Sequence, residues 1–212
     1  MRALARLTMV VLASLLPLGG VASATTNPHA NPGFETGDFT GWVVGDPALA
    51  DIVTEWVTEN GGIYSPLGAY MAVLWGGAED WPSTIEQRMN LAAGDVLEGW
   101  AAFDAADYLP YNDYAYVSVS NGANEVLWQK SVGDVGDLGD GVPEAWSWTA
   151  PAAGTYTLQY GVVNSGDRIN PSYGLFDVGG LNYQPTPEPA TCGLLLVSGG
   201  TFLLRRRTRA RR

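Results

Sequence analysis

Apolar and polar residues alternate along much of this chain, and the alternation predicts β-strands rather than helices. In the segment 84–91, Ile85, Met89 and Leu91 fall on one face of an extended chain and polar side chains on the other. The segment 69–75 is almost continuously apolar, as in a strand that is buried on both faces. The same reasoning predicts strands at 69–75, 84–91, 96–103, 114–120, 125–129, 155–163, 173–178 and 181–183.

Many short strands separated by Gly, Asn, Asp and Pro are typical of a domain built from two packed sheets. We therefore expect residues 25–184 to form an all-β, two-sheet antiparallel sandwich of the jelly-roll type. Trp146 and Trp148 share one face of a further strand by the same period of two. We expect these two indoles in the core rather than at a ligand site.

The amino-terminal end has the pattern of a secretory signal peptide. Arg2 and Arg6 precede an apolar run at 7–18. The small-residue sequence Ala22-Ser23-Ala24 follows at the distance expected for a cleavage site. We therefore expect a signal peptide helix at 1–24 that is removed on export.

The carboxyl-terminal end has the pattern of a short membrane anchor. The apolar run 190–204 would span roughly 22 Å as a helix, against roughly 30 Å for the hydrocarbon core of a bilayer. Six arginines follow it, and the positive-inside rule keeps them in the cytoplasm. The predicted division of the chain is a signal peptide at 1–24, a β-sandwich domain at 25–184, a Pro-rich linker at 185–189, a transmembrane helix at 190–204 and a basic cytoplasmic tail at 205–212.

Acidic residues are concentrated in the middle of the chain. All 22 of them, but only Arg88, Lys130 and Arg168 among the basic residues, lie between 25 and 190, which gives this interval a formal charge of −19. Such a surface repels phosphate backbones, so we expect no nucleic-acid partner and favour divalent cations or neutral glycans. Solubility alone is the other explanation of this charge. The single cysteine, Cys192, lies in the apolar run at 190–204, so no disulfide is expected within the domain.

The sequence does not favour an enzyme. A nucleophilic triad needs a base, and His29, close to the predicted signal cleavage site, is the only histidine. The same shortage of His and Cys argues against a zinc site of the usual kind. Pairs of carboxylates are abundant, but among 22 acidic residues a pair has no meaning without its geometry.

The tripeptide Pro187-Glu188-Pro189, followed by an apolar run and an arginine cluster, resembles the PEP-CTERM sorting signal of Gram-negative bacteria. The resemblance covers about the last 26 residues, with all three parts in order. It implies that an exosortase-type processing enzyme recognises the motif and removes the tail. It also implies a protein that is anchored transiently in the inner membrane and then delivered to the cell surface or the exopolysaccharide matrix.

The segment "NPGFETGDFTGW" at 31–42 resembles the opening of galactose-binding-like jelly rolls found in carbohydrate-binding modules. The resemblance implies a structural calcium ion shared by Glu35 and by Asp177 near the end of the last strand. Calcium takes six to eight oxygen ligands, so backbone carbonyls would have to complete such a site. Gly179 and Gly180 depart from the usual ending of that strand.

The segment "FDAADYLPYNDYAY" at 103–116 combines oxygen donors with tyrosines and is the predicted binding loop. Its candidate residues are Asp104, Asp107, Tyr108, Tyr111, Asn112 and Asp113. The carboxylates suit a metal ion, although the loop lacks the central glycine and closing glutamate of an EF-hand. The tyrosines suit stacking on sugar rings. A polar loop whose tyrosines only pack at the sandwich edge is the third alternative.

Two functions follow from these patterns. The first is a structural or adhesive protein of the cell surface or exopolysaccharide matrix. The alternative is a carbohydrate-binding module with a defined glycan ligand. Aromatic side chains exposed along one sheet face or loop rim would favour the alternative, whereas burial of all eight tryptophans would favour the first.

Overall fold

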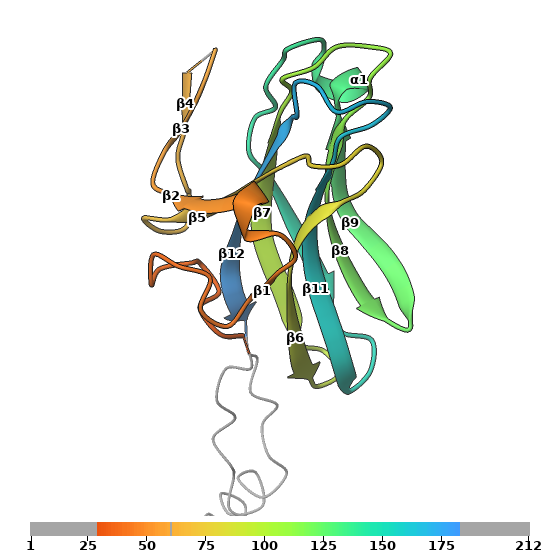
Figure 1. The fold of residues 1–212 in the computed structure, drawn as a ribbon. Helices are drawn as coiled ribbons and strands as arrows, with labels where there is room; N and C mark the ends of the chain where they lie inside the picture. The colour runs from red at the N-terminus through yellow and green to blue at the C-terminus, as the bar shows by residue number, and fades with distance from the viewer. Residues whose placement is uncertain (1–28, 60, 183–212) are drawn as a thin grey trace, which may run out of the picture. The chain divides into compact units, whose positions relative to one another are not determined.

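The computed structural model describes residues 29–59 and 61–182, in which two five-stranded antiparallel sheets form a sandwich (Figure 1). Sheet A has the order β1 (Val43–Val44), β6 (Ser83–Leu91), β11 (Gly154–Val163), β8 (Tyr114–Asn121) and β9 (Ala123–Ser131). Sheet B has the order β10 (Glu144–Thr149), β7 (Val96–Asp104), β12 (Tyr173–Asn182), β5 (Met71–Trp75) and β2 (Ala50–Val53). The prediction of an all-β, two-sheet antiparallel sandwich is confirmed.

Helical structure is slight. Among the residues that the structure describes, it consists of a 3-10 turn, η1 (Pro47–Leu49), and one turn of helix, α1 (Val132–Val135). Within 29–59 and 61–182, no helix has the length and apolar character needed to cross a membrane. The predicted signal peptide helix, sorting motif and transmembrane helix all fall outside the described residues.

The core lies between the two sheets and is rich in aromatic rings. Tyr160 of β11 stacks on Phe176 of β12, with ring centroids 4.7 Å apart and planes 6° apart. Trp42 also stacks on Tyr160, with ring centroids 5.4 Å apart. Trp146 and Trp148 are buried in the same core, as the period of two predicted. Stacked aromatic rings contribute large apolar area, which replaces disulfides as a source of stability.

The two sheets differ in what covers their outer faces. A hairpin of β3 (Trp56–Thr58) and β4 (Gly61–Ile63) contributes Ile63 and Trp56 to a second apolar cluster with Trp100 and Leu175. Trp100 and Leu175 alternate with the core residues of β7 and β12, so this cluster lies on the outer face of sheet B. The side chains on the outer face of sheet A are mostly polar.

The last strand is longer than the sequence pattern predicts. The two predicted strands at 173–178 and 181–183 form the single strand β12, with a register shift between Val178 and Gly180 against β7. A glycine pair inside a strand is typical of such a bulge, because it lets the backbone leave the regular pleat. The departure noted at Gly179 and Gly180 is therefore a local irregularity and not the end of the strand.

Candidate functional site

The outer face of sheet A is polar, and we identify it as the candidate functional site. Ile85 and Leu158 belong to the core, so their neighbours Glu86 and Gln159 point to the opposite side. The outward side chains are Thr84, Glu86, Arg88 and Asn90 of β6, Thr155, Thr157 and Gln159 of β11, and Tyr114, Tyr116, Ser118 and Ser120 of β8. All of these except Ser118 are at least partly exposed.

Tyr116 is the central aromatic residue of this face, and it packs against the backbone of β11. Its partner in the ladder is Gly161. A Cβ atom at Gly161 would lie only 2.3 Å from Cζ of the tyrosine ring. Glycine is therefore required here, because any side chain would displace the ring from the sheet.

Hydrogen bonds fix the orientation of Tyr116. Its hydroxyl donates to Oε1 of Gln159 at 2.9 Å, and Nε2 of Gln159 donates to Oε2 of Glu86 at 3.1 Å. Burial, followed by the neighbouring Tyr114 and Glu86, raises the pKa of Tyr116 to about 12. The phenol therefore keeps its proton at neutral pH. Side chains from three adjacent strands are thus held in one arrangement before any ligand arrives.

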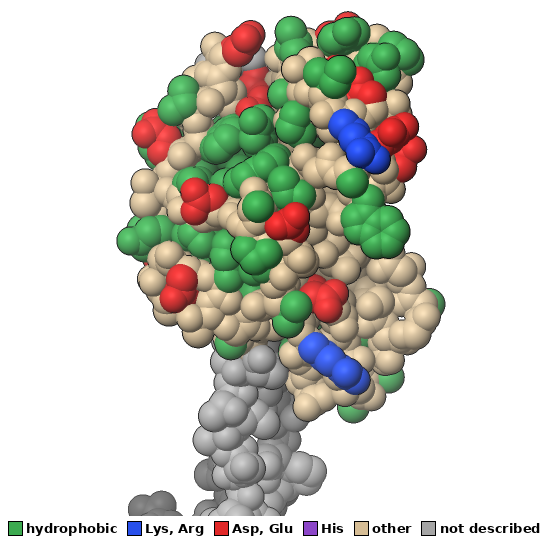
Figure 2. Space-filling view, in the orientation of Figure 1, with side chains coloured by type: hydrophobic (Ala, Val, Ile, Leu, Met, Phe, Trp, Pro, Cys, Tyr) green, Lys and Arg blue, Asp and Glu red, His purple; other side chains and the backbone are tan. Residues whose placement is uncertain are grey.

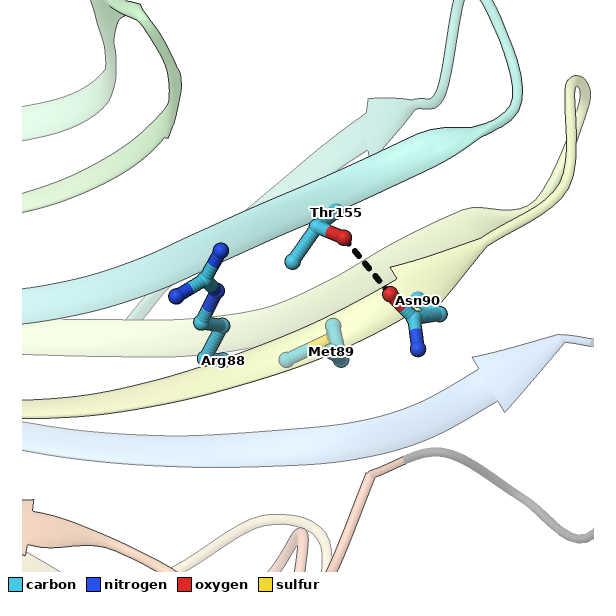
Figure 3. Close-up of a pocket in the computed structure, with 4 residues that line it drawn as sticks. All are labelled: Arg88, Met89, Asn90 and Thr155. Carbon is cyan, nitrogen blue, oxygen red and sulfur yellow. Dashed lines mark hydrogen bonds between the residues drawn. The ribbon is translucent and has the colours of Figure 1, made fainter.

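The carboxyl-terminal half of β6 borders a hollow of about 520 Å³ (Figure 3). Its lining includes Arg88, Met89, Asn90 and Thr155. The Thr155 hydroxyl donates to Oδ1 of Asn90 at 2.7 Å. Arg88 lies on the same side of the sheet, whereas Met89 points into the core. The hollow therefore presents a guanidinium, an amide and a hydroxyl along one edge of the face.

This combination suits a particular kind of ligand. A sugar ring has an apolar C–H face, which stacks on an aromatic ring, and hydroxyls that pair with amides, carboxylates and guanidinium groups. On this face, Tyr116 is the aromatic ring available for stacking. Gln159, Glu86 and Arg88 are the polar side chains available to sugar hydroxyls.

In the predicted loop at 103–116, the structure uses most of the polar side chains for internal contacts. Oδ2 of Asp104 accepts from the Trp56 indole at 2.7 Å, and Oδ1 of Asn112 accepts from the Gly133 amide at 2.8 Å. Asp107 and Asp113 are buried. These four side chains therefore do not form an exposed cluster of oxygen donors.

The tyrosines of the same segment divide into two pairs. Tyr108, which is 48% exposed, and Tyr111 meet edge to face at the rim of the loop, with ring centroids 5.9 Å apart. Tyr114 and Tyr116 belong to β8 and lie on the outer face of sheet A, 6.3 Å apart. Only the first pair remains as an exposed part of the predicted loop site.

Glu35 and Asp177 lie close together around Gly33. A Cβ atom at Gly33 would be 3.3 Å from Oδ1 of Asp177, 3.5 Å from Cγ of Glu35 and 3.6 Å from the Val178 carbonyl oxygen. The carboxylate of Glu35 accepts from the Ala69 amide at 3.0 Å. The absence of a side chain at Gly33 thus leaves a space that carboxylate and carbonyl oxygens border.

The carboxylate oxygens of Asp177 and Glu35 already accept hydrogen bonds from the protein. Asp177 accepts from the Ser65 hydroxyl and, at 2.6 Å, from the Val178 amide. Burial above all raises the pKa of Asp177 to about 6, and the charge of Glu35 adds to the effect. In the described part of the chain, no three His, Cys, Asp or Glu side chains are grouped to hold a metal. Backbone carbonyls would therefore have to supply the remaining ligands.

The sequence reasoning missed the face around Tyr116, although two signals for it are present. The alternation in 84–91 that places Ile85 in the core places Glu86 and Arg88 on the opposite face. Gly161 within a long strand indicates a close approach of another group. Tyr116 falls both in the predicted strand at 114–120 and in the predicted loop segment at 103–116, and only loop residues before it are among the site candidates of that segment.

Comparison with known proteins gives similar folds at low identity. No protein-family profile matches the chain, and no curated protein matches it. A family 61 carbohydrate-binding module, solved with β-1,4-galactotriose, is 19% identical with a TM-score of 0.47, over 76% of this chain and 100% of the module. Tandem family 22 carbohydrate-binding modules of Paenibacillus barcinonensis are 15% identical with a TM-score of 0.43, over 74% of this chain and 45% of theirs.

An adhesin domain is similar to a comparable degree. The cleaved adhesin domain of Lys-gingipain from Porphyromonas gingivalis is 16% identical with a TM-score of 0.41, over 69% of this chain and 95% of that domain. At these identities and scores we transfer neither a ligand nor a site residue from any of the three proteins.

Proposed function

We propose that this protein is an exported carbohydrate-binding protein whose sandwich binds a neutral polysaccharide along the outer face of sheet A. The observation that supports it is Tyr116, which packs on Gly161 and is held by Gln159 and Glu86. A preorganised aromatic ring with polar neighbours on an open sheet face gives a long glycan a continuous surface to bind.

The charge of the domain argues for a neutral glycan. Acidic side chains are scattered across the face shown in Figure 2, and basic ones are few there. Of the basic residues at 29–59 and 61–182, Lys130 pairs with Glu144 at 3.0 Å. A polyanionic glycan would meet repulsion from most of this surface, whereas hydroxyl groups would not.

A structural or adhesive role in the exopolysaccharide matrix is the second candidate, and the sorting motif at 187–189 favours it. The two roles share a location, because exosortase processing would deliver the domain to that matrix. They differ in whether one face of the domain is responsible for retention. Loss of retention after a change on the outer face of sheet A would favour the glycan-binding role.

The test is glycan binding by residues 25–184, measured on arrays and by affinity electrophoresis in neutral polysaccharide gels. Tyr116→Ala is expected to weaken binding at least about tenfold, which is about 1.4 kcal/mol. Tyr116→Phe keeps the ring and loses only the bond to Gln159, so most of the affinity should remain. Tyr64→Ala removes a tyrosine that is 58% exposed and bonded to Glu55, away from this face.

The matched variants also define the result that would contradict the proposal. Equal binding by the Tyr116→Ala and Tyr64→Ala proteins would exclude the Tyr116 face as the glycan site. Melting temperatures of all variants must be compared, because a loss of binding without unfolding is the informative outcome.

A further inference from the structure

A buried polar cluster lies between the sheets at the end of the sandwich that carries the loop 105–113. Its members Asp113, Asn164 and Ser172 are 0% exposed, and Asp107 is 2% exposed. Such a cluster is costly inside an apolar core unless every polar atom finds a partner.

The strand register brings two of these residues to the same end of one ladder. The ladder of β11 and β8 ends at the pair Val163 and Tyr114, and Asn164 and Asp113 are the residues directly beyond this pair. Because Tyr114 points outward, Asp113 points to the core side, and Asn164 shares that side with the core residue Val162. The Ser165 amide, next to Asn164 in the chain, donates to Asp113, so the two segments are in contact.

Hydrogen bonds satisfy Asp113 and Ser172 but leave one oxygen of Asp107 and the side chain of Asn164 without partners. Oδ1 of Asp113 accepts from the Ser165 amide at 2.7 Å, and Oδ2 accepts from the Ser172 hydroxyl at 2.8 Å and the Ser172 amide at 3.1 Å. Oδ2 of Asp107 and both polar atoms of the Asn164 amide have no hydrogen-bond partner. Three buried polar atoms therefore need something that the protein itself does not supply.

The cluster also has uncompensated charge. Asp107 and Asp113 are close enough to interact, and burial followed by this like charge raises the pKa of Asp113. The groups that donate to Asp113 are neutral. Arg168, in the loop that leads to Ser172, is exposed. Two buried carboxylates in this situation need a bound proton or a bound cation.

We propose that this cluster is a second cation site, which takes calcium through Asp107, Asp113 and Asn164. A carboxylate oxygen and an amide oxygen without partners are the hard donors that calcium prefers, and backbone carbonyls and water would complete the six to eight ligands. Asp177 lies five residues beyond Ser172, about 17 Å along the strand, and on the outer face of sheet B. The two sites are therefore separate.

A cation here would connect two segments of the chain directly, the loop 105–113, which carries Tyr108 and Tyr111, and the end of β11. The hydrogen bonds from Ser172 to Asp113 already join the start of β12 to the same loop. The proposal does not depend on glycan binding by the outer face of sheet A.

The first test counts the calcium ions bound per chain by equilibrium dialysis of the full chain in mild detergent. Asp107→Asn is expected to lose one bound ion relative to the wild-type protein. Asp51→Asn, at an exposed carboxylate of β2, is the matched control and should lose none. Wild-type stoichiometry in the Asp107→Asn protein would overturn the proposal. The Glu35→Gln protein is measured separately, to show whether an ion is bound in the space around Gly33.

A second variant covers the case in which Asp107→Asn does not fold. Asn164→Asp adds a third carboxylate to the cluster. A bound cation would compensate its charge, whereas without a cation the repulsion among the three carboxylates would destabilise the fold. We expect a lower melting temperature than the wild-type protein in chelator, and a larger rise on addition of calcium chloride. Equal destabilisation with and without calcium would show that the cluster holds only protons or water and would overturn the proposal.

Discussion

His29 shows how one residue makes the stability of the whole domain depend on pH. It is buried beside Trp42, with ring centroids 5.5 Å apart. Burial lowers its pKa from 6.5 to about 4. The folded protein therefore holds the neutral imidazole, whereas the unfolded chain binds a proton below pH 6.5. The part of the unfolding free energy that depends on neutral His29 is fully present above pH 6.5 and is lost as the pH falls toward 4.

The difference in pKa corresponds to about 3 kcal/mol of unfolding free energy. We expect the wild-type protein to lose about this much more stability than His29→Phe between pH 7 and pH 4, measured by urea denaturation at each pH. The phenyl ring preserves the contact with Trp42 and cannot titrate. Parallel stability profiles of the two proteins would show that the histidine is not protonated on unfolding.

At the scale of single residues, the sequence shows which side chains could bind a ligand, but it does not show which of them are buried. Glu35 and Asp177 were paired through a resemblance in their motifs, and the structure places both beside Gly33. Asp107 and Asp113 lie in an equally polar segment, yet both are buried. The burial of Asp113 depends on contacts with Ser165 and Ser172, more than 50 residues away, which local composition does not reveal.

At the scale of elements, the segment 31–42 is joined to the rest of the domain through the carboxylate of Glu35. This carboxylate accepts from the Ala69 and Tyr70 amides just before β5, and the Glu35 side chain lies beside Gly33 together with Asp177 of β12. A calcium ion shared by Glu35 and Asp177 would therefore connect the first segment, β5 and the last strand. It would also relieve the repulsion between the two carboxylates.

We expect calcium at 100 times its dissociation constant to stabilise the domain by about 2.7 kcal/mol through this site. Glu35→Gln keeps the shape of the side chain and should lose that part of the calcium effect, measured by thermal denaturation with and without chelator. Glu79→Gln, at an exposed glutamate, is the control and should respond like the wild-type protein. An undiminished calcium response in Glu35→Gln would place calcium elsewhere.

The long strands could be predicted because apolar and polar residues alternate along each of them. The short strands contain too few residues to show this alternation. β6 matches its predicted range to within one residue, and the pattern for β7 differs only at its last residue. The hairpin of β3 and β4 has three residues in each strand and includes Gly61 and Gly62, so no alternation marks it. Its position depends on the bond from Trp56 to Asp104, 48 residues away.

At the scale of the whole molecule, the domain and the ends of the chain differ in the sign of their net charge. The full sequence has a formal charge of −11, whereas the interval 25–190 has −19, because eight of the 11 basic residues lie in the predicted signal peptide and tail. A domain of this charge is repelled by anionic membrane surfaces. Retention outside the cell would then depend on specific contacts such as those of the outer face of sheet A.

Processing at both ends should therefore change the charge of the protein as well as its mass. We expect protein extracted from the surface of the native host to lack the residues after the motif at 187–189, and to focus at a lower pH than the value of about 4.3 for the full sequence. Intact-mass measurement and isoelectric focusing test this together. Replacing Pro187 and Pro189 by alanine should leave the chain in the membrane fraction with its arginines. Recovery from the cell exterior of a chain that still ends in Arg212 would show that the tail is not a processing signal.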